Sequence, residues 1–296
     1  MKSLKIVKAE YRRVGYDETD IEKTEYVETE ASYNEAGQLV KEQRFDPDGN
    51  VNTVTINEFD KNGNLFQSEQ YDQDNILLQK SVNQYDEDGL LVQQSNYFGD
   101  GSTEYITRFV YDNVGHEIRR EMYYDGRLDY VEREMEYQNG RLVKDTENDD
   151  YGNTMNIYFY EYDDKGQVVK HIREEVQNKD RRTYEYEYDE KGNRIKELVY
   201  DYNDMLIAKT YRKYNENNLL TEIEEEDLDN YRKITLEYEN NIVVKNSILN
   251  KEGELQGWAE YTYDENGKEN SSREFIKDEI QPENFRLLRE TRYERD

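Results

Sequence analysis

Pairs of carboxylates are the residues of this sequence with the most evident capacity for chemistry. Two carboxylates can hydrolyse a glycoside when their surroundings separate their pKa values, which requires one unique and partly buried setting. Here the pairs recur at positions typical of solvated turns. Carboxylate-pair glycoside hydrolysis is therefore the third of three hypotheses, and we expect a non-enzymatic protein. The pairs are Asp46/Asp48, Asp86/Asp88, Asp149/Asp150, Asp163/Asp164 and the run Glu224-Glu225-Glu226-Asp227.

Metal and nucleophile chemistry has weaker support. The Asp-x-Asp-Gly pattern at residues 46–49, repeated at 86–89, resembles the start of a calcium loop but lacks the downstream bidentate glutamate. The chain has no cysteine and two histidines, His116 and His171. Thiolate zinc sites and cysteine nucleophiles are excluded, and we predict no metal and no cofactor.

Tyrosine is the unusual residue, with 29 copies in 296 residues. Because side chains alternate along a strand, two ladders each place three rings on one face. Packing against neighbouring repeats is one interpretation, and an exposed aromatic binding strip is the other. For Trp258, packing is favoured over sugar stacking. The candidate binding residues are the two ladders with neighbouring acids: Tyr158, Tyr160, Tyr162, Tyr184, Tyr186, Tyr188, Glu185, Glu187, Glu224, Glu225 and Glu226.

A repeat of about 26 residues organises almost the whole chain. Its core is Tyr-Asp-x-x-Gly-x-Leu, and a second turn lies between successive copies. Glycine, asparagine or aspartate occupies each turn position, which predicts a residue with positive φ. A type I turn followed by a bulge is the expected form, with a bulge or shortened turn at Gly126 and Asn241. The copies begin at Tyr33, Phe59, Tyr85, Tyr111, Tyr137, Tyr162, Tyr188, Tyr214, Tyr238 and Tyr263. The turn series is Gly37, Gly49, Gly63, Asn75, Gly89, Gly101, Gly115, Gly126, Gly140, Gly152, Gly166, Asn178, Gly192, Asp204, Asn218, Asn230, Asn241, Gly253 and Gly267.

These turns must connect strands, since the segments between them are short and rich in β-branched and aromatic residues. We predict an all-β fold: a single repeat domain of about twenty antiparallel strands in an up-and-down meander, coiled into a spiral or arch. Residues 1–32 form N-terminal capping strands, 33–275 the repeats and 276–296 a C-terminal cap. The spacing of Phe285, Leu288 and Arg292 predicts that this cap is a short helix, with Pro282 at its first position.

Composition limits the partners. The formal net charge is −29, with acids spread over nearly every repeat, which disfavours nucleic acid and fits a basic partner. Solubility of a thin sheet is the alternative reason for the charge. No apolar run approaches the roughly 18 residues that span a bilayer, and no signal peptide is evident, so we expect a cytoplasmic protein that does not bind membranes.

At these motifs the chain resembles the YD-repeat, or RHS-repeat, family, over residues 33–275. Tyr85-Asp86 with Gly89 and Leu91 matches the family motif, and Gly126-Arg127-Leu128 matches its Gly-Arg-Leu core. More distantly, the chain is similar to MORN and related antitoxin-type repeats. The resemblance implies a β-strand spiral that wraps or binds another polypeptide, often in bacterial toxin systems, or binds carbohydrate.

The leading hypothesis is a protein-binding repeat protein. In its sharper form, the chain is an immunity or antitoxin protein that neutralises a basic toxin domain through an acidic, tyrosine-rich sheet. The runner-up is a carbohydrate-binding module that uses exposed tyrosines. The sequence does not identify the partner, the binding face or the oligomeric state.

Overall fold

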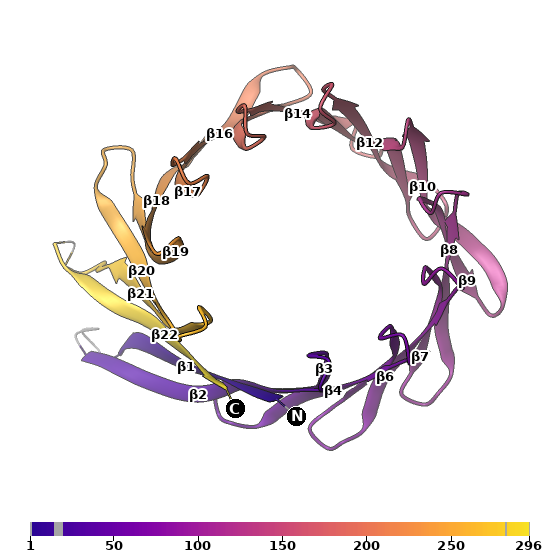
Figure 1. The fold of residues 1–296 in the computed structure, drawn as a ribbon, viewed down its shortest axis with the longest axis horizontal. Coiled ribbons are helices and arrows are strands. Elements are labelled where there is room, and N and C mark those ends of the chain that lie inside the picture. The colour runs from indigo at the N-terminus through magenta and orange to yellow at the C-terminus, as the bar shows by residue number, and fades with distance from the viewer. Residues whose placement is uncertain (1, 15–19, 282, 296) are drawn as a thin grey trace. The chain divides into compact units, whose positions relative to one another are not determined.

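The computed structural model describes residues 2–14, 20–281 and 283–295, which form strands joined by turns and short loops (Figure 1). The first eleven strands are β1 (Lys2–Val14), β2 (Asp20–Tyr33), β3 (Leu39–Phe45), β4 (Val51–Phe59), β5 (Leu65–Tyr71), β6 (Leu77–Tyr85), β7 (Leu91–Phe98), β8 (Thr103–Tyr111), β9 (Glu117–Tyr124), β10 (Arg127–Gln138) and β11 (Arg141–Asn148). The others are β12 (Thr154–Tyr162), β13 (Val168–Glu175), β14 (Asp180–Tyr188), β15 (Arg194–Tyr200), β16 (Leu206–Tyr214), β17 (Leu220–Asp227), β18 (Tyr231–Glu239), β19 (Ile242–Leu249), β20 (Leu255–Tyr263), β21 (Glu269–Lys277) and β22 (Phe285–Arg295).

The all-β antiparallel meander predicted from the repeat is confirmed. With one exception, every described pairing joins strands that are consecutive in the chain. The exception is β1 with β22, where Ile6 lies opposite Tyr293 and Lys8 opposite Thr291. The expectation of a spiral or arch is therefore wrong, because the first and last strands pair with each other (Figure 1).

The predicted C-terminal helix is also wrong. Residues 285–295 form β22, which pairs with β21 on one side and β1 on the other. An extended segment there satisfies the backbone groups of two strand edges at once, and that gain outweighs a weak helical spacing of three side chains. Pro282, the expected first helical residue, lies outside the described residues.

The chain divides into two compact units. Unit 1 comprises the described residues of 1–56, 71–76 and 211–296, and unit 2 comprises residues 57–70 and 77–210. Few apolar residues are buried: among the described residues these are Val7, Ala9, Ala31 and Ala259, all in unit 1. The sheet is thin, as its shortage of aliphatic residues predicts, and backbone and polar contacts must supply much of its order.

The turns use aspartate as a structural acceptor. In the turn at residues 46–50, Asp46 Oδ1 accepts the backbone N–H groups of Asp48 (3.0 Å) and Asn50 (2.8 Å). The Gly49 N–H donates to the Asp46 carbonyl at 3.0 Å, and Gly49 has a φ of 84°. Hydrogen bonds from the Asn50 side chain, and then from backbone N–H groups, lower the pKa of Asp46. The same arrangement recurs at most turns, both in the motif and between its copies, so these carboxylates are occupied in holding the turns.

Most of the predicted turn positions are confirmed. Gly126 and Asn241 complete shortened two-residue turns in which both central residues have positive φ, the form that suits tight hairpins. Two positions are wrong: positive φ falls on Lys179 instead of Asn178, and Asn230 does not have it. In the turn at 227–230, the Asp227 side chain accepts backbone N–H groups of Asp229 and Asn230.

The motif tyrosine ties neighbouring strands together. In seven repeats its hydroxyl donates to a backbone carbonyl near the start of the preceding strand, at 2.6 to 3.1 Å. In each case the acceptor carbonyl lies two residues after the motif glycine of the preceding repeat, or after the asparagine that replaces it. The contact therefore links the motif tyrosine of one repeat to the motif turn of the repeat before it. The pairs are Tyr85 with Leu65, Tyr111 with Leu91, Tyr137 with Glu117, Tyr162 with Leu142, Tyr188 with Val168, Tyr238 with Leu220 and Tyr263 with Val243.

Replacing Tyr188 with phenylalanine is expected to lower the free energy of unfolding by about 1 kcal/mol, because the half-buried Val168 carbonyl loses its side-chain donor. Urea denaturation measures the change. Tyr202→Phe is the control, since Tyr202 is an exposed turn residue. Equal effects of the two substitutions would contradict a role for the hydroxyl.

Candidate binding surfaces

The predicted tyrosine ladders lie in unit 2, on β12 and β14, and their rings are half-buried. Tyr158 donates to Glu147 Oε2 at 3.2 Å, and Tyr162 and Tyr188 make the backbone contacts described above. The Arg194 guanidinium lies 5.0 Å from the ring centroid of Tyr186, and burial raises the pKa of Tyr186 to about 12. These contacts favour the packing interpretation of the ladders.

His171 on β13 joins the two ladders. It lies opposite Tyr160 on one side and Tyr184 on the other in the strand register. The rings stack, with His171 centroids 4.9 Å from Tyr160 and 5.1 Å from Tyr184. Burial lowers the pKa of His171, so this histidine is neutral at pH 7. The sequence did not indicate that His171 completes an aromatic row across three strands.

A buried ion pair lies beside this row. Asp145 on β11 is 1% exposed, and Arg133 on β10 donates to both of its carboxylate oxygens. Asp145 lies opposite Tyr158 and Met135 in the register. Hydrogen bonding to Asp145 raises the pKa of Arg133, which keeps its charge. The geometry indicates a structural role for this ion pair, because its carboxylate is not accessible to solvent.

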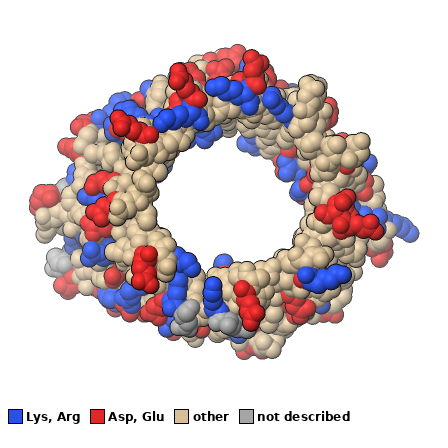
Figure 2. Space-filling model, viewed as in Figure 1, with Lys and Arg blue, Asp and Glu red and all other residues tan. Residues whose placement is uncertain are grey.

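The predicted glutamates are paired with cations or hydroxyls. Glu187 contacts Lys196 at 2.6 Å, Glu225 contacts Arg232 at 2.6 Å and Glu226 contacts Lys251 at 2.9 Å. Glu185 and Glu224 bond the hydroxyls of Tyr200 and Tyr231 respectively. Figure 2 shows basic side chains interspersed among acidic ones on the viewed face. Much of the sheet's acidity is thus compensated locally.

The structure does not assemble the eleven predicted residues into one site. The tyrosines, Glu185 and Glu187 belong to unit 2, whereas Glu224, Glu225 and Glu226 lie on β17 in unit 1. Glu185 and Glu187 also alternate with the ladder tyrosines along β14, so they point to the opposite face. Within the described ranges, no group of three or more histidine, aspartate or glutamate residues could hold a metal ion.

A surface that the sequence analysis missed follows the turns of unit 2. Successive turns of a meander lie at alternate ends of the strands. We call the end with the motif turns the first-turn edge and the end with the intervening turns the second-turn edge. In unit 2 the second-turn edge consists of the turns at residues 98–102, 125–126, 149–153, 176–179 and 201–205, the strand residues that flank them, and the first residues of β6, which pair with the end of β7 at Phe98.

Exposed apolar side chains gather at the second-turn edge. Tyr151 is 83% exposed, Tyr202 63% and Tyr124 60%. Unit 2 has twelve exposed large hydrophobic residues, and nine of them lie at this edge. They are Leu78, Phe98, Tyr124, Leu128, Tyr151, Val176, Tyr202, Met205 and Leu206, against Phe66, Val110 and Val114 at the first-turn edge. A monomeric protein rarely exposes such a row of apolar side chains to solvent unless the row is an interaction site.

The same edge is acidic. Its five turns contain six aspartates and one lysine, Lys179. Hydrogen bonds from Ser102 lower the pKa of Asp100. At Asp149, partial desolvation raises the pKa, but hydrogen bonds from Asn153 and Tyr151 lower it by more, so the pKa of Asp149 lies below its ordinary value. These turns therefore stay negatively charged at neutral pH, and the edge combines apolar rings with fixed negative charge.

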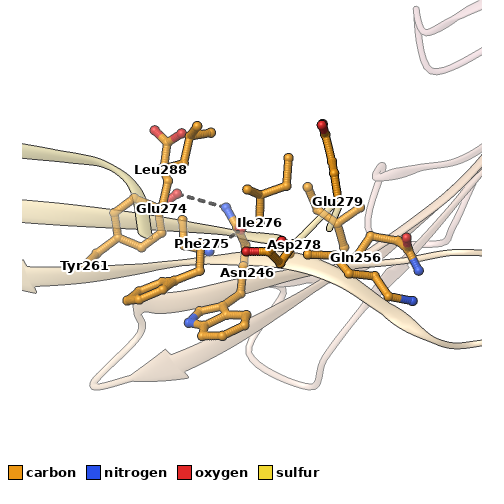
Figure 3. Close-up of a pocket in the computed structure, with 14 residues that line it drawn as sticks. Asn246, Gln256, Tyr261, Glu274, Phe275, Ile276, Asp278, Glu279 and Leu288 are labelled. Atoms are coloured by element: carbon orange, nitrogen blue, oxygen red, sulfur yellow. Dashed lines mark hydrogen bonds between the residues drawn. The ribbon is translucent and has the colours of Figure 1, made fainter. Parts of the chain in front are cut away.

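Unit 1 contains a pocket of about 700 Å³ over β19, β20 and β21 (Figure 3). Its floor is made of small residues, Gly257 and Ala259, and its walls include Ile248, Ile276 and Leu288. A Cβ on Gly257 would lie 2.5 Å from the Phe275 carbonyl oxygen, so the close approach of β20 and β21 requires glycine there. The pocket exists because the strand residues that form its floor are small.

Polar groups surround this pocket. Asn246 Nδ2 donates to the Tyr261 hydroxyl at 2.8 Å, and Asn246 Oδ1 accepts the Ala259 N–H at 3.2 Å (Figure 3). The Glu274 carboxylate lies 3.8 Å from Arg289 Nη1, and Glu279 is exposed. Asp278 is 5% exposed and is bound by Arg13 of β1 and by backbone N–H groups.

Trp258 lies behind the pocket. Its indole stacks on Phe275 at a centroid distance of 4.6 Å and meets Phe285 edge-on at 4.9 Å. In Figure 3 the Phe275 ring projects from the side of the sheet opposite Tyr261, Glu274 and Leu288. Trp258 lies opposite Phe275 in the strand register and therefore shares its face. The packing interpretation of Trp258 agrees with these contacts.

No protein-family model and no curated protein matches this chain. Similar solved structures include the TcdB2-TccC3-Cdc42 crystal structure, at 14% sequence identity and a TM-score of 0.40, covering 91% of this chain and 18% of that one. The Tc holotoxin pore of Photorhabdus luminescens matches at 14% identity and a TM-score of 0.38, covering 86% and 18% respectively. This chain therefore spans about a fifth of the length of those toxin chains.

A porin-like protein from Bacteroides uniformis matches at 11% identity and a TM-score of 0.37, covering 99% of this chain and 97% of that one. Across its described residues, this chain contains no helix long and apolar enough to cross a membrane.

Proposed function

We propose that this chain is a non-enzymatic binding protein that captures a basic polypeptide at the second-turn edge of unit 2. The observation that carries the proposal is the one-sided distribution of exposed apolar side chains, nine at that edge against three at the other. Apolar and aromatic side chains supply most of the affinity at protein interfaces, while complementary charge directs the encounter.

The charge of this edge selects the class of partner. Nucleic acid and anionic membrane surfaces carry the same sign as the aspartates of the turns, so both would be repelled. A cationic polypeptide with apolar residues complements both properties of the edge. The tyrosine ladders give less support to the carbohydrate alternative, because their rings and hydroxyls are engaged in packing.

The resemblance of the repeat motif to YD-repeat proteins supports a polypeptide partner. In its narrower form, the proposal is that the partner is a basic toxin domain and that this chain is its immunity or antitoxin protein. In that case binding would cover or distort the toxin's functional surface.

The proposal is tested with a synthetic peptide of alternating leucine and lysine, compared with a serine-lysine peptide of equal charge. We expect the leucine-lysine peptide to bind at least about tenfold more tightly. Raising the salt from about 50 to about 500 mM should weaken binding about tenfold or more, because screening removes the charge attraction. Equal affinity for the two peptides would overturn the proposal.

A matched pair of variants locates the surface. Tyr124→Ser, Tyr151→Ser and Tyr202→Ser combined remove three exposed rings from the second-turn edge, whereas Phe66→Ser, Val110→Ser and Val114→Ser combined remove three apolar side chains from the other edge. We expect the first variant to lose at least about tenfold in affinity and the second to change little. Equal losses, measured by calorimetry, would place the binding elsewhere.

A further inference from the structure

We propose that the pocket of unit 1 is a separate binding site for a small organic cation, one in which an amine is attached to an apolar body. The site does not depend on the function proposed for unit 2, since all its residues belong to β19–β22 and the loop between β21 and β22. Three features of the pocket carry the inference: its floor, its walls and the charge at its rim.

The floor and walls fit an apolar body. Gly257 and Ala259 leave the middle of β20 without bulk, while Ile248, Ile276 and Leu288 rise around it. A volume of about 700 Å³ lies within the range of known ligand pockets. Filling this space would remove apolar side chains from water, which is the main source of affinity for small apolar groups.

The rim favours a positive charge. Asp278 and Lys277 are already compensated, by Arg13 and by Glu254 at 3.8 Å respectively. The remaining acids are Glu274, whose side chain is 41% exposed and only loosely paired with Arg289, and the exposed Glu279. An ammonium group at the rim would donate a charge-assisted hydrogen bond to the Glu274 carboxylate.

Tyr261 adds a second attraction. Its ring lines the pocket next to Glu274, and the face of an aromatic ring attracts a nearby cation. A sugar would instead need an open aromatic face and several free polar partners. The Asn246 amide is committed to Tyr261 and Ala259, and the Trp258 indole is packed on the other side of the sheet. The pocket therefore suits an apolar amine better than a carbohydrate.

The test uses 2-phenylethylamine as probe, with 2-phenylethanol and phenylacetate as its neutral and anionic counterparts and methyl glucoside as a sugar. Trp258 is the only tryptophan of the chain and packs on Phe275, a residue of the pocket lining, so its fluorescence reports on this site. We expect saturable binding of the amine, at least about tenfold tighter than the alcohol, and none of phenylacetate. Equal binding of amine and alcohol, or binding of the glucoside alone, would overturn the inference.

Two variants separate the contribution of the apolar floor to binding from that of the charge at the rim. Ala259→Leu fills the floor and is expected to abolish binding, whereas Glu274→Gln keeps the shape and is expected to weaken amine binding about tenfold without affecting the alcohol. Thr262→Leu, an exposed change on the opposite face of β20, is the control. Circular dichroism establishes that each variant is folded. Undiminished binding by a folded Ala259→Leu protein would show that the amine binds elsewhere.

Discussion

Replacing Arg133 with methionine is expected to lower the free energy of unfolding by about 3 kcal/mol, because it leaves a buried carboxylate without its counter-charge. Asp145 is 1% exposed, and Arg133 supplies both of its charged hydrogen bonds. Methionine keeps most of the arginine's volume, so the loss isolates the charge from the packing. Chemical denaturation followed by circular dichroism measures the effect.

Removing both charges should recover most of that loss. In the double variant Arg133→Met with Asp145→Leu, no ion remains to be desolvated, and such replacements are often neutral or stabilising. Arg232→Met is the control, because the Arg232–Glu225 pair is 55% and 36% exposed and should contribute less than about 1 kcal/mol. A single variant as stable as the wild type would show that the pair contributes nothing to the fold.

Gly99→Ala is expected to cost about 2 to 3 kcal/mol, since there is no room for a methyl group at this turn. A Cβ on Gly99 would lie 1.9 Å from the Leu77 carbonyl oxygen and 2.9 Å from its carbon. Both are backbone atoms, so β6 or the turn at 98–102 must move to admit it. Because the change lies within the second-turn edge, it should also weaken peptide binding there.

Gly101→Ala, two residues on, is the matched control. Gly101 has a φ of 84° with nothing within 4 Å of a built Cβ, so alanine there meets only backbone strain, which costs about 1 kcal/mol. Denaturation curves of the two variants should therefore separate clearly. Equal destabilisation would mean that the turn relaxes without disturbing β6.

The turns and strands could be predicted from the sequence because their causes are local. Positive φ at Gly49 or Asn75 depends on residue type and immediate neighbours, and aspartate at the turn start bonds its own backbone. The repeat places the same local sequence pattern at each successive turn, which made the pattern easy to recognise. The prediction of a positive φ at Asn178 was wrong because the adjacent Lys179 has the positive φ instead. No local pattern distinguishes these two positions, which differ by one residue.

The C-terminal strand and the binding surfaces could not be predicted in the same way. Residues 285–295 are extended because they pair both with the preceding strand, β21, and with the distant strand β1, and no neighbouring residue reveals the need for a partner on β1. The pocket brings Asn246, Gly257 and Glu274 together from three strands. The second-turn edge did leave a signal, since Tyr151 and Tyr202 stand inside turns of otherwise polar residues. That signal has meaning only once the meander places alternate turns on one side.

The pairing of β1 with β22 has a consequence for how this chain folds during synthesis. Most strands find their partner in the segment made immediately before or after them, so hairpins can form as the chain emerges. Strand β1 must instead keep one edge unsatisfied until residues 285–295 have left the ribosome. Joining such distant segments carries a high entropic cost and should be the slow, late step. The charged side chains of Lys5, Lys8 and Glu10 give that waiting edge protection against pairing with another chain.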